Sequence, residues 1–123
     1  MRIRKVTCAV DCGIVVNPDG ARAQIEGSVL FGVSNALKEY GTVANGALVQ
    51  SNFHDYQVLR MDEVPDVEVH VVDSREYPTG LGEPGTTTIA PALSNAIFAA
   101  TGARVRSVPL LPARVLKALQ EKA

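Results

Sequence analysis

The stretch Gly80-Leu81-Gly82-Glu83-Pro84-Gly85, with the apolar run at 88–101 behind it, is the segment around which the sequence is organised. It places one carboxylate in a glycine-rich turn, and the next basic residue along the chain is Arg104. The run that follows repeats apolar residues at steps of three and four and stops before Gly102, which predicts a helix over 88–101 with Pro91 in its first turn. The function therefore depends on whether Glu83 is a catalytic base or only a turn residue.

A second amphipathic pattern lies upstream and predicts a helix over 21–39. Its apolar stripe is Ile25, Val29, Val33, Ala36 and Tyr40. Asp19 is expected to cap the start of this helix and Gly41 to end it. Gly27 and Gly32 each cost the helix about 1 kcal/mol relative to alanine, which predicts a very close neighbour.

The remaining chain alternates between strand patterns and turns. Strands are expected at 3–10, 48–51, 67–72 and 105–110, with an Asn45-Gly46 hairpin turn before the second of them and a terminal helix at 112–122. The element order is then β-α-β-β-α-β-α, typical of an α+β two-layer sandwich. Residues 1–123 are expected to form a single domain, because the length suits one modest core.

Composition excludes several classes of function. The chain has 12 basic and 13 acidic residues, a net charge of −1, so no basic field calls for nucleic acid. No signal peptide or membrane segment is evident, which leaves the compartment open between cytoplasm and periplasm. Cys8 and Cys12 are expected to be buried free thiols, and no metal site is predicted, because zinc needs four close ligands.

Several ordered motifs together carry a family resemblance. They are Val10-Asp11-Cys12-Gly13, Ala23-Gln24-Ile25-Glu26-Gly27, Gln50-Ser51-Asn52-Phe53-His54-Asp55-Tyr56 and Gly82-Glu83-Pro84-Gly85. In this order, over about residues 6–110, the chain resembles the C-terminal part of the molybdenum-binding subunit of the xanthine dehydrogenase and aldehyde oxidase family. The branch it is most similar to is the isoquinoline 1-oxidoreductase beta subunit. Subunits of that family are several times longer than this chain.

The resemblance implies a molybdenum hydroxylase that oxidises N-heterocycles or aldehydes with water as the oxygen source. Its cofactor would be molybdenum held by a pyranopterin, of the molybdopterin cytosine dinucleotide type. Glu83 would be the general base. The implied cofactor contacts are Gln24, Gly27, Gly82, Gly85 and Thr86.

The implied partners are the remaining segments of the molybdenum subunit, an iron–sulfur subunit and a small-molecule substrate. The chain alone is expected to bind no cofactor and to be inactive. The alternative function is a non-catalytic remnant of the family that folds or self-associates without cofactor. At the residue level, the alternatives are that Glu83 only caps the following helix, and that His54, Asp55 and Tyr56 form a hydrogen-bonded loop rather than part of a site.

Overall fold

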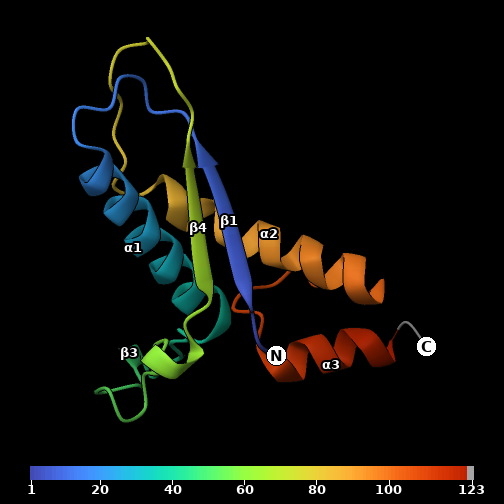
Figure 1. The fold of residues 1–123 in the computed structure, drawn as a ribbon. Coiled ribbons are helices and arrows are strands. Elements are labelled where there is room, and N and C mark those ends of the chain that lie inside the picture. The colour runs from blue at the N-terminus through green and yellow to red at the C-terminus, as the bar shows by residue number, and fades with distance from the viewer. Residues whose placement is uncertain (122–123) are drawn as a thin grey trace.

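The computed structural model describes residues 1–121 (Figure 1). In chain order the elements are β1 (Lys5–Val10), α1 (Pro18–Leu37), β2 (Val43–Ala44), β3 (Ala47–Leu48), the 3₁₀ turn η1 (Met61–Glu63), β4 (Asp66–Val71), α2 (Pro84–Thr101) and α3 (Pro112–Gln120). Of the terminal helix expected at 112–122, residue 122 lies outside the described part.

The central sheet consists of two parallel strands, β1 and β4, with Cys8 opposite Val69 in the register. Parallel strands need a long crossover connection, and α1 with the β2–β3 hairpin provides it. One face of the sheet is polar: Glu68 pairs with Lys5 at 2.6 Å and with His70 at 3.1 Å. This face is the solvent side, as expected for strands that alternate inward and outward residues.

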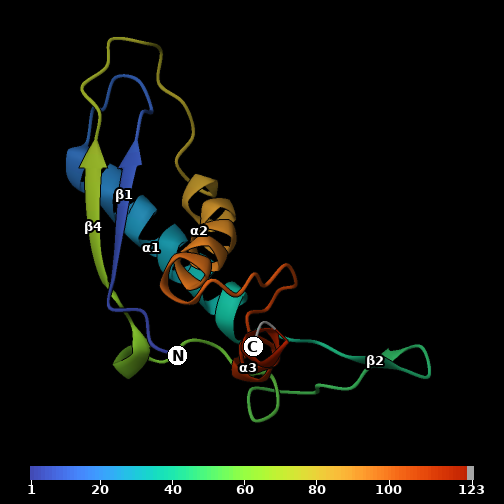
Figure 2. The same cartoon turned by 90° about the vertical axis from the view of Figure 1, so that its right-hand side faces the viewer.

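Both long helices cover the other face of the sheet, which gives two layers (Figure 2). Ile25, Val29 and Val33 on α1 are fully buried and form the core with Val69 of β4 and Ile89 of α2. Each such aliphatic side chain contributes roughly 1.5–3 kcal/mol on burial. The expected α+β two-layer class is confirmed.

The ends of α1 differ from the prediction. Asn17, rather than Asp19, is the N-cap, and its side chain accepts a hydrogen bond from the Gly20 backbone N–H at 3.0 Å. Asn before Pro18 suits this arrangement because proline is favoured at the first helical position. The helix ends at Leu37, so Gly41 lies beyond it and does not terminate it.

Helix α2 starts at Pro84, one turn earlier than the sequence pattern suggested. The expectation that Pro91 falls in the first turn is therefore wrong: it lies inside the helix, where its missing N–H leaves one backbone bond unmade. Gly102 ends the helix in the left-handed conformation, at φ 70°, as predicted.

The strand predicted at 105–110 is wrong, because the structure has no strand there. Val105 and Leu110 are buried, as a strand pattern suggests, but individual contacts hold the backbone instead. The Ser94 hydroxyl donates to the Val105 carbonyl at 2.6 Å, and the Leu110 N–H donates to the Ala36 carbonyl at 2.6 Å. The β2–β3 hairpin turns at Asn45-Gly46 as expected, but its second strand ends at Leu48.

Candidate functional site

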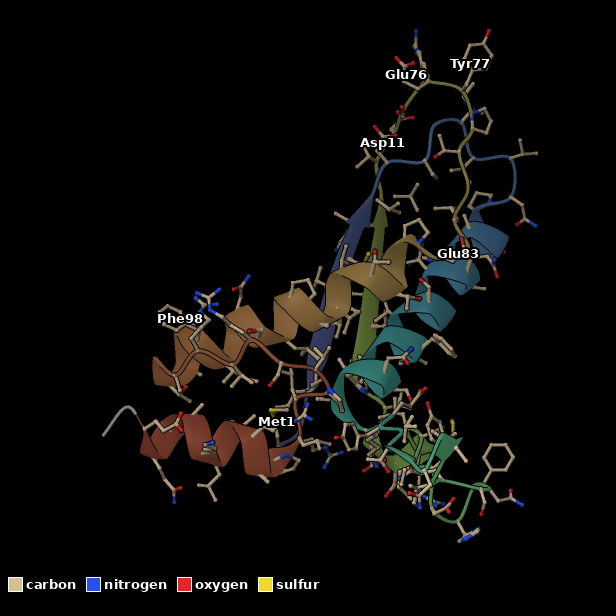
Figure 3. All side chains as sticks on the ribbon, turned by 180° about the vertical axis from the view of Figure 1, so that it is seen from behind. Met1, Asp11, Glu76, Tyr77, Glu83 and Phe98 are labelled. Atoms are coloured by element: carbon tan, nitrogen blue, oxygen red, sulfur yellow. The ribbon has the colours of Figure 1, made fainter. Side chains whose placement is uncertain are left out.

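The segment 79–83, here called the Glu83 turn, links the long loop after β4 to the start of α2. Figure 3 shows Glu83 where this loop enters α2, beside the N-terminal half of α1. Upstream, the Thr79 N–H donates to the Cys12 carbonyl at 2.9 Å, which ties the turn to the segment that follows β1. The turn is therefore fixed at one end by the segment after β1 and at the other end by the start of α2.

The middle of the turn is held by a single apolar side chain. Leu81 is half-buried and packs against the core, whereas Gly80 and Gly82 on either side of it are exposed. A β-carbon added at either glycine would meet no atom within 4 Å. Leu81 thus anchors a turn whose other side is open, a role that its motif alone does not predict. The signal was available as one apolar residue between two glycines.

Glu83 occupies the N-cap position of α2, with φ −107° and ψ −17°, but its carboxylate makes no capping hydrogen bond. The side chain is exposed, and within residues 1–121 no hydrogen bond or ion pair engages it. The alternative that Glu83 merely caps the helix is therefore wrong. The Thr86 N–H donates to the Glu83 backbone carbonyl, and the carboxylate is left facing outward at the positive end of the α2 dipole.

The predicted contact residues divide into two groups. Gln24, Gly27 and Gly82 are exposed, and the space beside Gly27 is empty to 4 Å from the position of an added β-carbon. Gly85 and Thr86 instead face α1: Gly85 is buried, and the Thr86 hydroxyl donates to the Ser28 carbonyl at 3.0 Å.

The close helix contact inferred from the α1 glycines is present at Gly32 and not at Gly27. A β-carbon on Gly32 would lie 2.8 Å from the Thr86 carbonyl oxygen and 2.8 Å from the Ile89 side chain. Gly27 makes no such approach to any described residue. Packing among the described residues therefore does not explain why position 27 is a glycine.

The loop around Asp55 is a separate structure at the far end of α1. The Asp55 carboxylate accepts from the Ser51 and Asn52 N–H groups at 3.0 and 2.9 Å, and the Tyr56 hydroxyl donates to Glu39 at 3.1 Å. Ser28 and Glu39 are eleven positions apart, roughly 16 Å along a helix at 1.5 Å per residue. The hydrogen-bonded loop is thus the interpretation that the contacts support.

Other chemistry-bearing groups do not converge. Among the described residues no three His, Cys, Asp or Glu side chains are placed to hold a metal ion. Cys8 is half-buried and Cys12 is buried, and both are free thiols. Nor does any helix in that part of the chain have the length and apolarity to cross a membrane. Within residues 1–121, the Glu83 turn presents an exposed carboxylate without a hydrogen bond or ion pair, next to the open Gly82.

Comparison with known proteins assigns this two-layer α+β scaffold, with its exposed carboxylate at a helix start, to a class of protein. The family model described as the molybdopterin cofactor-binding domain matches residues 1–65. The chain belongs to this family. The match ends before Glu83, so the assignment does not depend on the turn.

Individual relatives extend the likeness over nearly the whole chain. The membrane-bound aldehyde dehydrogenase of Gluconacetobacter polyoxogenes is 48% identical over 95% of this chain and 15% of its own length. The isoquinoline 1-oxidoreductase beta subunit of Brevundimonas diminuta is 44% identical over 92% of this chain and 14% of its own. The chain therefore spans about one seventh of the length of these relatives, and the resemblance to the isoquinoline 1-oxidoreductase branch is confirmed.

The fold itself is found in a solved structure. Quinoline 2-oxidoreductase from Pseudomonas putida 86 superposes with a TM-score of 0.87, covering 98% of this chain and 16% of that one at 24% identity. At this identity the likeness shows the fold alone.

The cofactor named for the relatives is not uniform. The name of the Gluconacetobacter relative specifies pyrroloquinoline quinone, whereas the family model specifies molybdopterin. We give more weight to the family model, because it matches a sequence pattern within this chain, while the relative's name describes a protein about seven times as long. A molybdenum cofactor in the complete enzyme is the consistent assignment.

The exposed residues fit one side of such a cofactor. Gly27, Gly80 and Gly82 leave unobstructed backbone on α1 and on the Glu83 turn, as a flat ring system needs for close approach. Gln24 adds an exposed amide, one turn before Ser28 on the same side of α1. These open positions are compatible with a cofactor, and residues 1–121 place no atom within 4 Å of a β-carbon added at any of the three glycines.

Proposed function

We propose that this chain supplies the catalytic base and one wall of the cofactor site in a molybdenum hydroxylase acting on an aldehyde or an N-heterocycle. The single observation that carries the proposal is the unpaired, outward-facing carboxylate of Glu83 at the start of α2, directly after the open glycines Gly80 and Gly82. The names of the relatives, which include an aldehyde dehydrogenase and an isoquinoline oxidoreductase, support the substrate class.

In this proposal each exposed residue has a defined task. Gln24 donates its amide to the pterin, and Gly27 and Gly82 allow its ring system to approach the backbone. The bound molybdenum supplies the electron sink and the activation of water. Glu83 accepts the proton released as the water-derived oxygen is transferred to an electron-poor carbon. This carboxylate suits the work because it has no competing partner among the described residues, and Leu81 anchors the turn that carries it.

The rest of the enzyme must come from elsewhere. The opposite wall of the site would be formed by other segments of the molybdenum subunit, and an iron–sulfur subunit would carry electrons away. The relatives' names, a beta subunit among them, support an assembly of several subunits. The cytosine dinucleotide form of the cofactor is part of the same proposal.

The reaction class can be tested with isotopically labelled water. The native protein is purified with its accompanying subunits, its molybdenum is measured, and aldehydes and N-heterocycles are supplied with an electron acceptor in H₂¹⁸O. The proposal predicts molybdenum in stoichiometric amount and ¹⁸O in the hydroxylated product. A protein without molybdenum, or a product without ¹⁸O, would overturn it.

A second candidate function, a non-catalytic chain that self-associates, is favoured by a different observation. Large apolar side chains are widely exposed, among them Val16 and Tyr77 at 90% and Phe53 at 78%. Exposed apolar side chains mark an interaction site where they gather in one patch. Sedimentation of the chain tests this second candidate, because a clean monomer would count against it.

A further inference from the structure

The start of α2 is fastened to α1 by two contacts that lie immediately after Glu83. A β-carbon on Gly85 would stand 2.1 Å from the Ser28 hydroxyl oxygen and 3.3 Å from the Val29 backbone nitrogen, so the Ser28 side chain occupies the space that a larger residue at position 85 would need. One residue later the Thr86 hydroxyl donates to the Ser28 carbonyl at 3.0 Å. Both contacts meet the same residue of α1, and Ser28 is buried.

The Thr86 side chain is therefore committed to α1. A threonine hydroxyl has a single hydrogen to donate, and here it is given to a backbone carbonyl. The next two threonines behave differently: the Thr87 hydroxyl donates to Pro84 and the Thr88 hydroxyl to Gly85, both within α2. Of the three consecutive threonines, only Thr86 fastens α2 to α1.

The backbone of the same residue closes the Glu83 turn. The Thr86 N–H donates to the Glu83 carbonyl at 2.9 Å. Thr86 thus connects the residue that carries the carboxylate, through one backbone bond and one side-chain bond, to the α1 segment that carries Gln24 and Gly27. Thr86 therefore contacts both the Glu83 turn and helix α1, the two elements that carry the proposed site.

We propose that Thr86 is a positioning residue: its hydroxyl, bonded to Ser28, fixes the Glu83 carboxylate relative to the exposed face of α1, and it does not bind the cofactor. This inference rests on the proposed function for its catalytic meaning, and it replaces the cofactor contact that the family resemblance implied for Thr86. The claim that Thr86 joins the Glu83 turn to α1 rests only on the two hydrogen bonds of Thr86. Misplacement of a catalytic group by about 1 Å can cost a hundredfold in rate, so a positioning contact of this kind has a measurable effect.

The test compares three variants of the native holoenzyme. Thr86→Val keeps the shape and removes the donor, Thr86→Ser restores the donor, and Thr87→Val is the matched control in the same helical turn. Hydrogen-exchange mass spectrometry of the peptide containing residues 79–88 reports the local opening of the Glu83 turn. Molybdenum content and the separate values of kcat and KM report the site.

For Thr86→Val we expect exchange in this peptide to quicken about fivefold, the effect of losing roughly one hydrogen bond. We expect kcat to fall about tenfold, with KM and molybdenum content within twofold of the unmodified enzyme. Thr86→Ser should return the exchange rate and kcat towards those of the unmodified enzyme, and Thr87→Val should change neither. If Thr86→Val cannot be obtained folded, Gly85→Ala is the substitute. Its methyl group would push the start of α2 away from Ser28 and should produce the same faster exchange.

Two results would overturn the proposal. One is exchange in Thr86→Val equal to that in Thr87→Val. The other is loss of molybdenum from Thr86→Val with exchange unchanged, which would make Thr86 a cofactor contact. Failure of the proposed function has a different signature: Glu83→Gln would retain turnover while the exchange results for Thr86 stood.

Discussion

Three carboxylates outside the Glu83 turn are held in their charged form by specific donors. The Asn52 and Ser51 backbone N–H groups hold the pKa of Asp55 below its ordinary value of 3.8. Hydrogen bonds from Lys38 and from Lys5 lower the pKa values of Glu63 and Glu68 below 4.5. All three groups are open to solvent, so each contribution to stability is small and sensitive to salt.

These shifts predict an acid-sensitive loop at 51–56. A carboxylate whose pKa is lowered by folding stabilises the folded state fully above its unfolded pKa, and the effect is lost as pH falls through the folded pKa. Stability should therefore decline as pH drops below about 4. In Asp55→Asn, whose amide oxygen still accepts from the loop N–H groups but cannot ionise, this decline should be weaker.

Urea unfolding of both proteins at pH 7 and pH 3 checks this expectation. The difference between the two midpoints should be smaller for Asp55→Asn than for the unmodified chain. Equal differences would show that Asp55 does not contribute to the pH dependence.

At the scale of elements, Gly27 and Gly32 in the interior of α1 have opposite environments. A β-carbon at Gly32 would press on the Thr86 carbonyl at 2.8 Å, whereas one at Gly27 would meet nothing. Gly32→Ala should therefore destabilise the fold by about 1–3 kcal/mol through overpacking between α1 and α2. Gly27→Ala should stabilise it by up to about 1 kcal/mol, because alanine is the better helix former.

The free energy of unfolding from urea titrations measures both variants, each serving as the control for the other. Similar effects of the two substitutions would contradict the packing of α1 against α2 described above. In the holoenzyme Gly27→Leu should also lower the molybdenum content, because the larger side chain fills the space proposed for the pterin.

The elements that could be predicted from the sequence are those with a strong local signal. The four-residue spacing of Ile25, Val29 and Val33 placed α1 against the core, and Gly102 ended α2. The glycines around Pro84 favour a turn, whereas proline is also favoured at the first position of a helix. Because the turn signal is the stronger one in the sequence, the predicted start of α2 lies four residues after the observed start at Pro84.

Features that depend on distant residues could not be predicted. The Ser28–Thr86 hydrogen bond joins positions 58 apart, and no periodicity indicates such a pairing. Residues 105–110 have the apolar alternation of a strand, but a strand forms only where a neighbouring strand offers its backbone. Here Ala36 and Ser94 satisfy those groups instead. Within the candidate site, Glu83 was identified from its motif, whereas the anchoring by Leu81 emerged only from the packing.

For the whole molecule, the central sheet has only two strands, and the β2–β3 hairpin extends away from both layers (Figure 2). The hairpin exposes Val43 and Leu48, at 74% and 57%. A sheet this small with apolar side chains exposed nearby gains stability by association. We expect the 123-residue chain on its own to bind a hydrophobic dye and to sediment as more than a monomer.

Replacing Val43 and Leu48 together by lysine should reduce dye binding and association without lowering the thermal midpoint by more than a few degrees. Ser107→Lys, at an exposed site away from the hairpin, is the matched control and should change neither property. A clean monomer without dye binding in the unmodified chain would count heavily against self-association as its function.

The central claim, that Glu83 is the base of a molybdenum hydroxylase, is tested most directly by the turnover per molybdenum of Glu83→Gln in the native holoenzyme. Glutamine keeps the size and position of the side chain but cannot accept the proton. Turnover should fall about 10²–10⁴-fold with the molybdenum content unchanged. Turnover within threefold of the unmodified enzyme, at equal molybdenum content, would contradict it.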